Sequence, residues 1–189
     1  MAVIATNESS GNYEKAPVGM QQAVCVFVND IGNQPGEWQG KQLIRHQVII
    51  TWEIAEKMTQ GEYEGMPFML SKFYTLSLAE KANLRKDLES WRGKQFTEDE
   101  LRGFDLERLI GANCYLNVTS TDKDKRRISA ITPLPKGVPL ITPSTLTPSA
   151  KFMEWIEKER AKAVVVAQSH SDEAPMPNDE DAEKSDVPF

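Results

Sequence analysis

The 189-residue chain has few of the residues that build disulfides, metal sites and most catalytic sites: two cysteines and two histidines. Cys25 and Cys114 each lie in an apolar, strand-like run, with no CxxC pair. Two thiols form neither a disulfide framework nor a four-ligand zinc site, so we expect buried free thiols in a reducing compartment. His46 has no second ligand at metal-binding spacing. The sequence therefore predicts no metal and no cofactor.

Long apolar runs and catalytic motifs are also missing. No stretch approaches the ~20 apolar residues that span a bilayer, and residues 1–12 lack the charged-then-apolar pattern of a signal peptide. We therefore expect a cytoplasmic protein without membrane contact. The GxSxG, HExxH, Walker and GxGxxG patterns do not occur, and the acids are dispersed among bases. This composition predicts a protein that is not an enzyme.

Charge is distributed unevenly along the chain. The net charge is −6, and residues 170–189 hold seven acids against the single base Lys184. This stretch therefore accounts for the whole net charge, and the remaining body is neutral. It also lacks large apolar residues before Phe189, so it cannot bury enough surface to offset the entropy of ordering. We expect residues 166–189 to be a disordered acidic tail.

Five runs rich in β-branched and aromatic residues predict strands. They cover residues 21–29, 43–54, 67–78, 113–118 and 126–131. Residues 31–41 hold three glycines and a proline, which predicts a loop between the first two strands. In the second strand Val48, Ile50, Trp52 and Ile54 share one face by their alternation. In the third strand Tyr74, Leu76 and Leu78 do the same.

Helical patterns occur between the third and fourth strands. Ser77 and Glu80 have the spacing of a capping box, and Leu84, Leu88 and Trp91 follow as a helical stripe. Gly93 suits the left-handed residue after a helix end. Further along, Thr97 and Glu100 form a second capping box, the shorter helix that follows stops at Gly103, and Asp105 can cap a final turn.

The order strand, strand, strand, helices, strand, strand predicts a mainly β fold. A five-stranded OB-fold barrel with a helical insert between strands 3 and 4 fits this order. Another small β-barrel or a β-sandwich is the alternative. The expected layout is a flexible N-terminus (1–15), the barrel (16–137), a Pro-rich linker (138–149), an amphipathic helix (150–165) and the acidic tail (166–189).

The amphipathic helix carries Phe152, Trp155 and Ile156 on one side. This apolar side predicts packing either back on the barrel or against a second copy of the chain. A homodimer is therefore an open alternative, and it would gain avidity for a long ligand.

The chain ends in Asp186-Val187-Pro188-Phe189. A terminal phenylalanine can enter an apolar pocket while a basic residue takes its carboxylate. Here the sequence resembles the bacterial single-stranded-DNA-binding proteins, whose acidic tails end in Asp-Ile-Pro-Phe or close variants and dock replication and repair enzymes. The resemblance implies partner binding by Asp186, Val187, Pro188 and Phe189. An arbitrary acidic tail is the alternative interpretation.

The body carries a second resemblance. The stretches Trp52-Glu53-Ile54, Tyr74-Thr75-Leu76-Ser77-Leu78, 83–93 and Pro133-Leu134-Pro135-Lys136-Gly137 are similar to phage-encoded single-stranded-DNA-binding proteins, over roughly residues 18–137. This likeness implies an OB-fold that coats single-stranded DNA during phage replication, recombination and repair in the host cytoplasm. It carries no DNA-contacting residue over.

DNA-contacting residues are instead predicted from chemistry, because single-stranded DNA needs cations for phosphates and flat rings for bases. OB folds bind on the face of strands 2 and 3 and through the loops joining strands 1–2 and 4–5. The second of these loops holds Lys123, Lys125, Arg126 and Arg127, although a solvated charged turn has the same composition. The first holds Lys41 and Trp38, which either stacks on a base or plugs the barrel end.

The strands supply further candidates. By alternation Phe27 and Phe73 face outward, opposite to the core residues, and can stack on bases. Lys72 lies on the core side near a strand end where it can reach solvent, and Arg45 precedes the second strand. Trp52 and Trp91 lie in apolar stripes and are expected in the core.

One alternative of a different class remains open. The chain can be a structural or host-interaction protein whose tail mimics the host motif without any DNA binding by the body.

Overall fold

The computed structural model describes residues 14–164, apart from the side chain of Trp38. The chain is mainly β, as predicted. The strands are β1 (Gly19–Trp38), β2 (Lys41–Lys57), β3 (Pro67–Thr75), β4 (Asn113–Ser120) and β5 (Arg126–Pro133), and the helices are α1 (Asn83–Arg92), α2 (Glu98–Arg102), the 3₁₀ helix η1 (Leu106–Leu109) and α3 (Ala150–Arg160). None of the helices in this range is long and apolar enough to cross a membrane.

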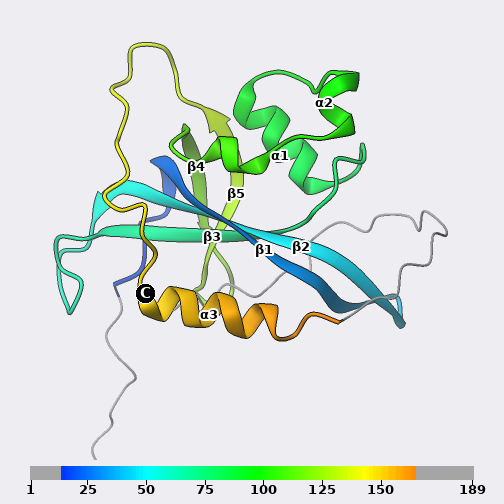
Figure 1. Ribbon diagram of the computed structural model, residues 1–189. Coiled ribbons are helices and arrows are strands. Elements are labelled where there is room, and N and C mark those ends of the chain that lie inside the picture. Colours follow the sequence, from blue (N-terminus) through cyan, green and yellow to red (C-terminus); the bar gives the residue numbers. More distant parts are fainter. Residues whose placement is uncertain (1–13, 165–189) are drawn as a thin grey trace, which may run out of the picture.

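All five strands form one antiparallel sheet in the order β3-β2-β1-β4-β5. β1 lies in the middle: its start pairs with β4 and the rest pairs with β2. Among the described residues, no ladder of hydrogen bonds joins β3 to β5, so the sheet is not closed. α1, α2 and η1 come between β3 and β4 in the chain and lie on one side of the sheet, opposite α3 (Figure 1).

The loop predicted for residues 31–41 is wrong, because β1 continues to Trp38 and pairs with β2 throughout. Gln39 and Gly40 connect the strands with φ of 49° and 74°. Positive φ at both positions matches the twist of a hairpin. Pro35 is tolerated because β4 pairs only with residues 19–24 of β1, which leaves the far half of β1 an edge strand.

The main core lies between the sheet and α1. The predicted faces are confirmed here, since Val48, Ile50, Trp52 and Ile54 of β2 and Leu84, Leu88 and Trp91 of α1 are all buried in it. The rings of Trp52 and Trp91 are 5.8 Å apart. Cys25 and Cys114 are free thiols in the same core, as expected, and burial raises the pKa of Cys25 to about 12. Of the predicted β3 face, Tyr74 is buried but Leu76 is 39% exposed.

The opposite face of the sheet is covered by α3. Ser149 caps this helix by accepting a hydrogen bond from the Phe152 amide at 3.1 Å. Phe152 and Ile156 are buried against Val24, Phe27, Ile49 and Phe73 of the sheet, together with Val26 and Ile31. The apolar side of α3 therefore packs on its own sheet, which is one of the two arrangements expected for it.

Of the two predicted capping boxes, one is wrong and one is confirmed. The Ser77–Glu80 capping box is wrong: α1 begins at Asn83 after Ala82, which makes no side-chain cap. Ser77 Oγ instead accepts from the Ala79 amide at 3.2 Å, in a turn that follows the end of β3. The Thr97–Glu100 box is confirmed in both directions, and Asp105 caps η1 through the Glu107 amide.

The segments that precede β1 and follow β5 in the chain are held by hydrogen bonds. Glu14 accepts hydrogen bonds from the Thr59 and Gln60 amides, at 2.6 and 3.2 Å. The segment 138–149 has no helix or strand, but the Ile141 amide donates to Asn113 Oδ1 at 2.9 Å. The Ser144 amide and hydroxyl donate to the buried carboxylate of Glu53. The contacts of Ile141 and Ser144 hold the segment before α3 on the sheet.

We expect Leu88→Ala to lower the free energy of unfolding by about 2–5 kcal/mol, because Leu88 is 1% exposed and its loss leaves a cavity between α1 and the sheet. Lys86→Ala, at an exposed position of the same helix, should change the free energy by no more than about 0.5 kcal/mol. Urea titration followed by circular dichroism measures both. Equal effects of the two substitutions would contradict the position of α1 in the core.

Candidate nucleic-acid interface

Phe27 and Phe73 lie on the face of the sheet turned away from the main core, as their alternation predicts, but they are not exposed. Phe27 is 7% exposed and Phe73 is 8% exposed. The Phe27 ring is 5.4 Å from that of Phe152, and Phe73 meets Trp155 edge-on at 5.8 Å. The expectation of two exposed aromatic platforms is therefore wrong, because α3 covers this face.

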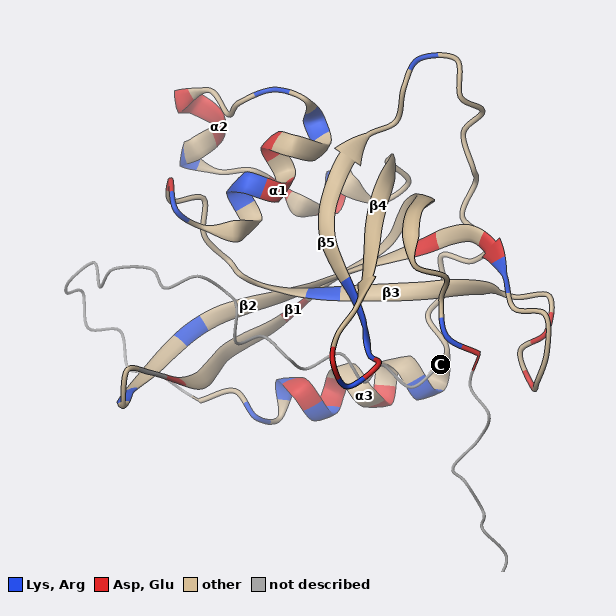
Figure 2. Cartoon of the chain, turned by 180° about the vertical axis from the view of Figure 1, so that it is seen from behind, with Lys and Arg blue, Asp and Glu red and all other residues tan. Residues whose placement is uncertain are grey.

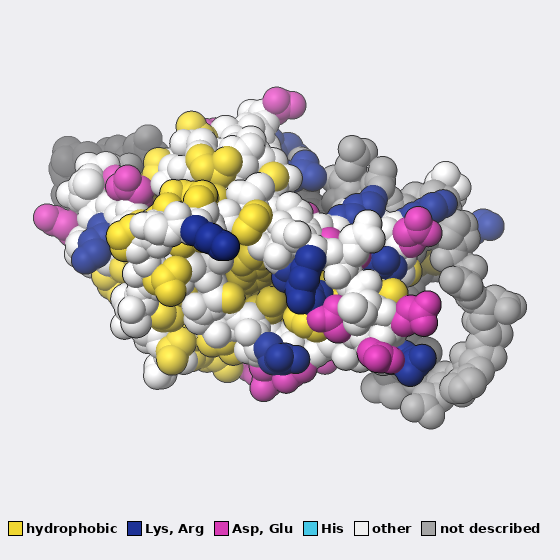
Figure 3. All heavy atoms as spheres, turned by 90° about the horizontal axis from the view of Figure 1, so that it is seen from above, with side chains coloured by type: hydrophobic (Ala, Val, Ile, Leu, Met, Phe, Trp, Pro, Cys, Tyr) yellow, Lys and Arg dark blue, Asp and Glu magenta, His cyan; other side chains and the backbone are white. Residues whose placement is uncertain are grey.

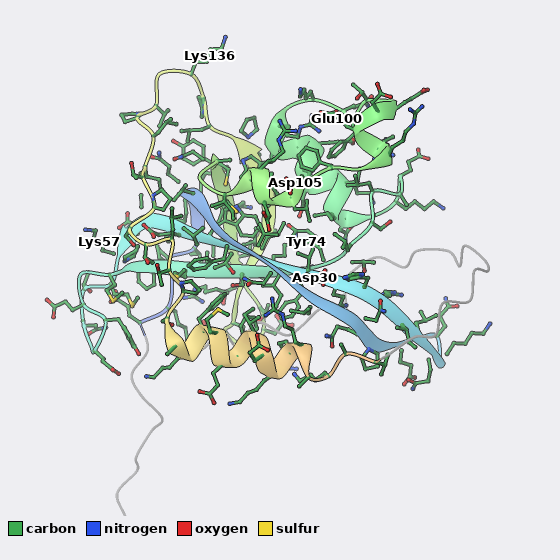
Figure 4. All side chains as sticks on the ribbon, viewed as in Figure 1. Asp30, Lys57, Tyr74, Glu100, Asp105 and Lys136 are labelled. Atoms are coloured by element: carbon green, nitrogen blue, oxygen red, sulfur yellow. The ribbon has the colours of Figure 1, made fainter. Side chains whose placement is uncertain are left out.

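Lys72 lies on the side of the sheet that carries α1, and it forms an ion pair with that helix. Its Nζ is 2.7 Å from Asp87 Oδ2 of α1 and 5.2 Å from the centre of the Tyr74 ring. Tyr74, labelled in Figure 4, donates its hydroxyl to the same carboxylate at 2.7 Å. Only 22% of the Lys72 side chain is exposed. The prediction that Lys72 is available to a phosphate is not supported by this position.

The β4–β5 turn places its four predicted bases differently. Arg126 is bound to the body: its Nε donates to the Ala16 carbonyl at 2.6 Å and one terminal nitrogen lies 2.9 Å from Asp124 Oδ1. Asp124 also pairs with Lys15. Lys123 and Arg127 are exposed, and Lys125 is half-buried. Of the four predicted bases, Lys123 and Arg127 are thus the exposed ones.

The β1–β2 hairpin carries the remaining candidates. Trp38 and Lys41 are partners at its tip, and Lys41 is exposed. The side chain of Trp38 lies outside the described part of the structure, so neither alternative for it is tested. Arg45 lies opposite Gln34, on the same face as Phe27 and Phe73. One of its terminal nitrogens is buried and makes no hydrogen bond to any described residue.

In exposed segments among residues 14–164, bases and acids alternate. Figure 2 shows this alternation in the β4–β5 turn and along α3. In α3 and just after it, Lys158, Arg160 and Lys162 pair with Glu154, Glu157 and Glu159. On the side of the sheet that carries α1, basic side chains are scattered among hydrophobic and acidic ones (Figure 3).

The candidate interface therefore combines the face of β1–β3 that α3 covers with the β1–β2 and β4–β5 turns. It holds Phe27, Phe73 and Arg45 on the sheet, Lys41 at one turn, and Lys123 and Arg127 at the other. Arg45 and Lys41 belong to the same hairpin, whereas Lys123 and Arg127 come from a different hairpin. No group of three or more His, Cys, Asp or Glu within residues 14–164 could hold a metal ion.

Sequence reasoning missed the polar contacts that hold α3 to β1. The buried Gln34 donates its amide to the Glu159 carbonyl at 2.9 Å, and Arg160 Nε donates to the Asp30 carbonyl at 2.9 Å. Asp30 also pairs with His46 at 2.7 Å. Burial raises the pKa of Asp30, but hydrogen bonds from the Gly32 amide and His46 outweigh it and hold the pKa below its usual range. Gln34 lies in a glycine-rich stretch of the sequence, and nothing in that stretch predicts its contact with α3.

Comparison with known protein families finds no family whose pattern matches this chain, and no curated protein matches it either. The four tail residues Asp186, Val187, Pro188 and Phe189 lie outside the described residues.

The anchor of the β4–β5 turn gives a pH prediction. The hydrogen bond from Lys15, followed by those from Arg126 and Ser120, lowers the pKa of Asp124 from 3.8 to about 2. The ionised carboxylate therefore stabilises the folded turn above about pH 4, and this stabilisation is lost as the pH falls to about 2. In Lys15→Ala, a carboxyl-detected NMR titration should show this pKa move up toward 3.8.

Lys86→Ala, remote from the turn, is the control for that titration. A pKa of Asp124 that stays near 2 in Lys15→Ala would rule out the contact between the N-terminal segment and the turn.

Proposed function

We propose that the protein is an OB-fold single-stranded-DNA-binding protein that coats DNA without strong sequence preference. The observation that supports this proposal best is the strand order β3-β2-β1-β4-β5 with helices between β3 and β4. An OB fold has the same five strands with a helix in that gap. β3 and β5 are in contact but no ladder of hydrogen bonds joins them. The OB fold is likewise a partly open barrel.

The two hairpins support the proposed mode of binding. OB folds bind oligonucleotides with the face of strands 2 and 3 and with the loops joining strands 1–2 and 4–5. In this chain Lys41 lies at the first connection, and Lys123 and Arg127 lie at the second. These cations suit phosphate contacts, and Arg45 lies on the same strand as Lys41 and on the same face as the aromatic residues. Contacts to the backbone alone carry no sequence information, which fits coating.

The proposed biological role follows from the tail. A carboxyl-terminal phenylalanine preceded by acids suits an apolar pocket with a basic rim on a partner protein. We assign to Asp186, Val187, Pro188 and Phe189 the recruitment of replication, recombination and repair enzymes. In this account the body holds DNA and the tail holds enzymes, in the cytoplasm of a bacterial host if the chain is encoded by a phage.

One observation favours the second candidate, a host-interaction protein that does not bind DNA. The face on which OB folds bind is covered here by α3, with Phe27 and Phe73 buried. This candidate predicts tail-dependent enzyme binding and no affinity of the body for oligonucleotides. The titration below separates the two.

We expect the full chain to bind fluorescein-labelled oligo-dT in an anisotropy titration, with an affinity that falls as salt rises. Each phosphate contact contributes about 0.7 to the slope of log K against log salt for a single strand. The double variant Lys123→Ala/Arg127→Ala should therefore bind more weakly and show a slope smaller by about 1.4. Lys94→Ala/Lys136→Ala removes the same charge from exposed positions elsewhere and should keep the slope. Lys136, for example, points away from the body (Figure 4).

Two results would contradict the proposal. Absence of binding at low salt would favour the host-interaction protein, and an equal loss of slope in both double variants would show that only overall charge matters.

Deletion of residues 170–189 should leave oligo-dT binding intact or strengthen it, because the deleted stretch carries the whole net negative charge. The same deletion should abolish capture of a host enzyme that recognises such tails. Phe189→Ala is the matched point variant, since it keeps the charge and removes the ring. A truncated chain that no longer binds oligo-dT would refute the division of roles between body and tail.

A further inference from the structure

The face of the sheet beneath α3 is apolar and carries two aromatic rings. Its buried residues Val24, Val26, Phe27, Ile31, Ile49 and Phe73 all come from β1–β3, and α3 adds Phe152 and Ile156. Phe27 and Phe73 have one ring neighbour each on α3, at 5.4 and 5.8 Å. Without the helix, this face would present two rings beside Arg45.

The main core does not need α3. It is built from residues 16–131 and contains none of the residues that follow β5. Trp52, Trp91, Leu84 and Leu88 remain packed on one another whether or not the helix covers the other side of the sheet. Loss of α3 would thus expose one face of the sheet and leave the packing of the other intact.

The helix is held at its end by a few polar contacts. The Glu159 carbonyl accepts from Gln34 at 2.9 Å, Arg160 donates to Asp30, and the Val164 amide donates to the Asn33 carbonyl at 2.9 Å. A helix of 11 residues is marginal on its own in water, so its order depends on this docking.

The beginning of α3 has a natural hinge. Ser144 is fixed to Glu53, and the helix cap is Ser149. Between them, residues 145–148 include Pro148, and the hydrogen bonds of Thr145 and Thr147 are local: the Thr147 amide donates to Thr145 Oγ1 at 3.0 Å, and Thr145 Oγ1 donates to the Thr147 carbonyl at 2.8 Å. The helix can therefore swing away while the segment before it stays on the sheet.

We infer that α3 is a displaceable cover over the DNA-binding face: bases of single-stranded DNA replace the ring of Phe152 on Phe27 and the ring of Trp155 on Phe73. This inference rests on the proposed function. Its consequence is a reduced apparent affinity, because only molecules with α3 undocked can bind, and the apparent Kd is the intrinsic Kd divided by their fraction. Single-stranded DNA and the helix thus compete for one surface.

A disulfide that locks α3 tests the inference. Asn33→Cys/Val164→Cys joins two positions whose backbones are already hydrogen-bonded. The native Cys25 and Cys114 are fully buried and burial raises the pKa of each, so they should not react. We expect the oxidised variant to bind oligo-dT at least tenfold more weakly than the reduced variant, with full recovery on reduction. Asn33→Cys alone, under the same oxidising conditions, is the control.

Phe152→Ala tests the same contact in the opposite direction. It loosens the helix, so oligo-dT should bind at least tenfold more tightly than to the wild type, provided that circular dichroism shows the sheet intact. Trp155→Ala, at a half-buried position of the same helix, gives a milder version of this test.

The outcomes separate the two claims. If the wild type binds oligo-dT, and the Asn33→Cys/Val164→Cys variant binds it equally well in the oxidised and the reduced form, the cover is overturned and the proposed function still stands. Tighter binding of oligo-dT by Phe152→Ala than by the wild type would support the cover. Absence of binding in both would overturn the cover and the proposed function together.

Discussion

The structure depends on β1, the strand that pairs with both β2 and β4. Its first residues pair with β4, and residues 23–38 pair with β2, with irregularities between Cys25 and Phe27 and between Asp30 and Gly32. An extra residue at such a point bends and twists a strand. β1 can therefore belong to the sheet under α1 and also extend as a hairpin arm. This double pairing separates a main core on one side from a second apolar face on the other.

The second apolar face has two possible binding partners, α3 and DNA. An apolar sheet face with two phenylalanines must be covered in water, since exposed patches of this kind attract other surfaces. The chain supplies its own cover in α3, and the same rings are those that unstacked bases would contact. The surface that we propose for DNA is therefore also the surface on which the C-terminal helix packs. In this proposal, the affinity for DNA depends on the competition between DNA and α3 for this face.

Local patterns in the sequence predicted much of this structure. Alternation located the buried face of β2, the helical stripe located α1, and the Thr97 capping box and the apolar side of α3 were correct. The extent of β1 was not, because Gly36 and Pro35 are compatible with a hairpin only when the strand is at an edge. Alternation also gave the correct side for Phe27 and Phe73, but it cannot show that a helix more than 70 residues further along covers them.

Charge was the least predictable part of the site. Lys72 and Arg126 are cations by sequence, yet Lys72 binds Asp87 of another element, and Arg126 binds Asp124 of its own turn and the distant Ala16 carbonyl. Lys41, Lys123 and Arg127 are exposed, but no local pattern distinguishes them from the half-buried cations. Pairing over distance depends on the tertiary fold, which neither composition nor spacing encodes.

The central claim is that DNA lies on the face of β1–β3 that α3 covers. Photo-cross-linking of a bromodeoxyuridine-containing oligonucleotide, followed by mass spectrometry of the peptides, tests it directly. We expect cross-links at Phe27, Phe73 or the β1–β2 hairpin. Cross-links confined to α1, α2 and the loop after β5 would place the DNA on the opposite side of the sheet and contradict the account.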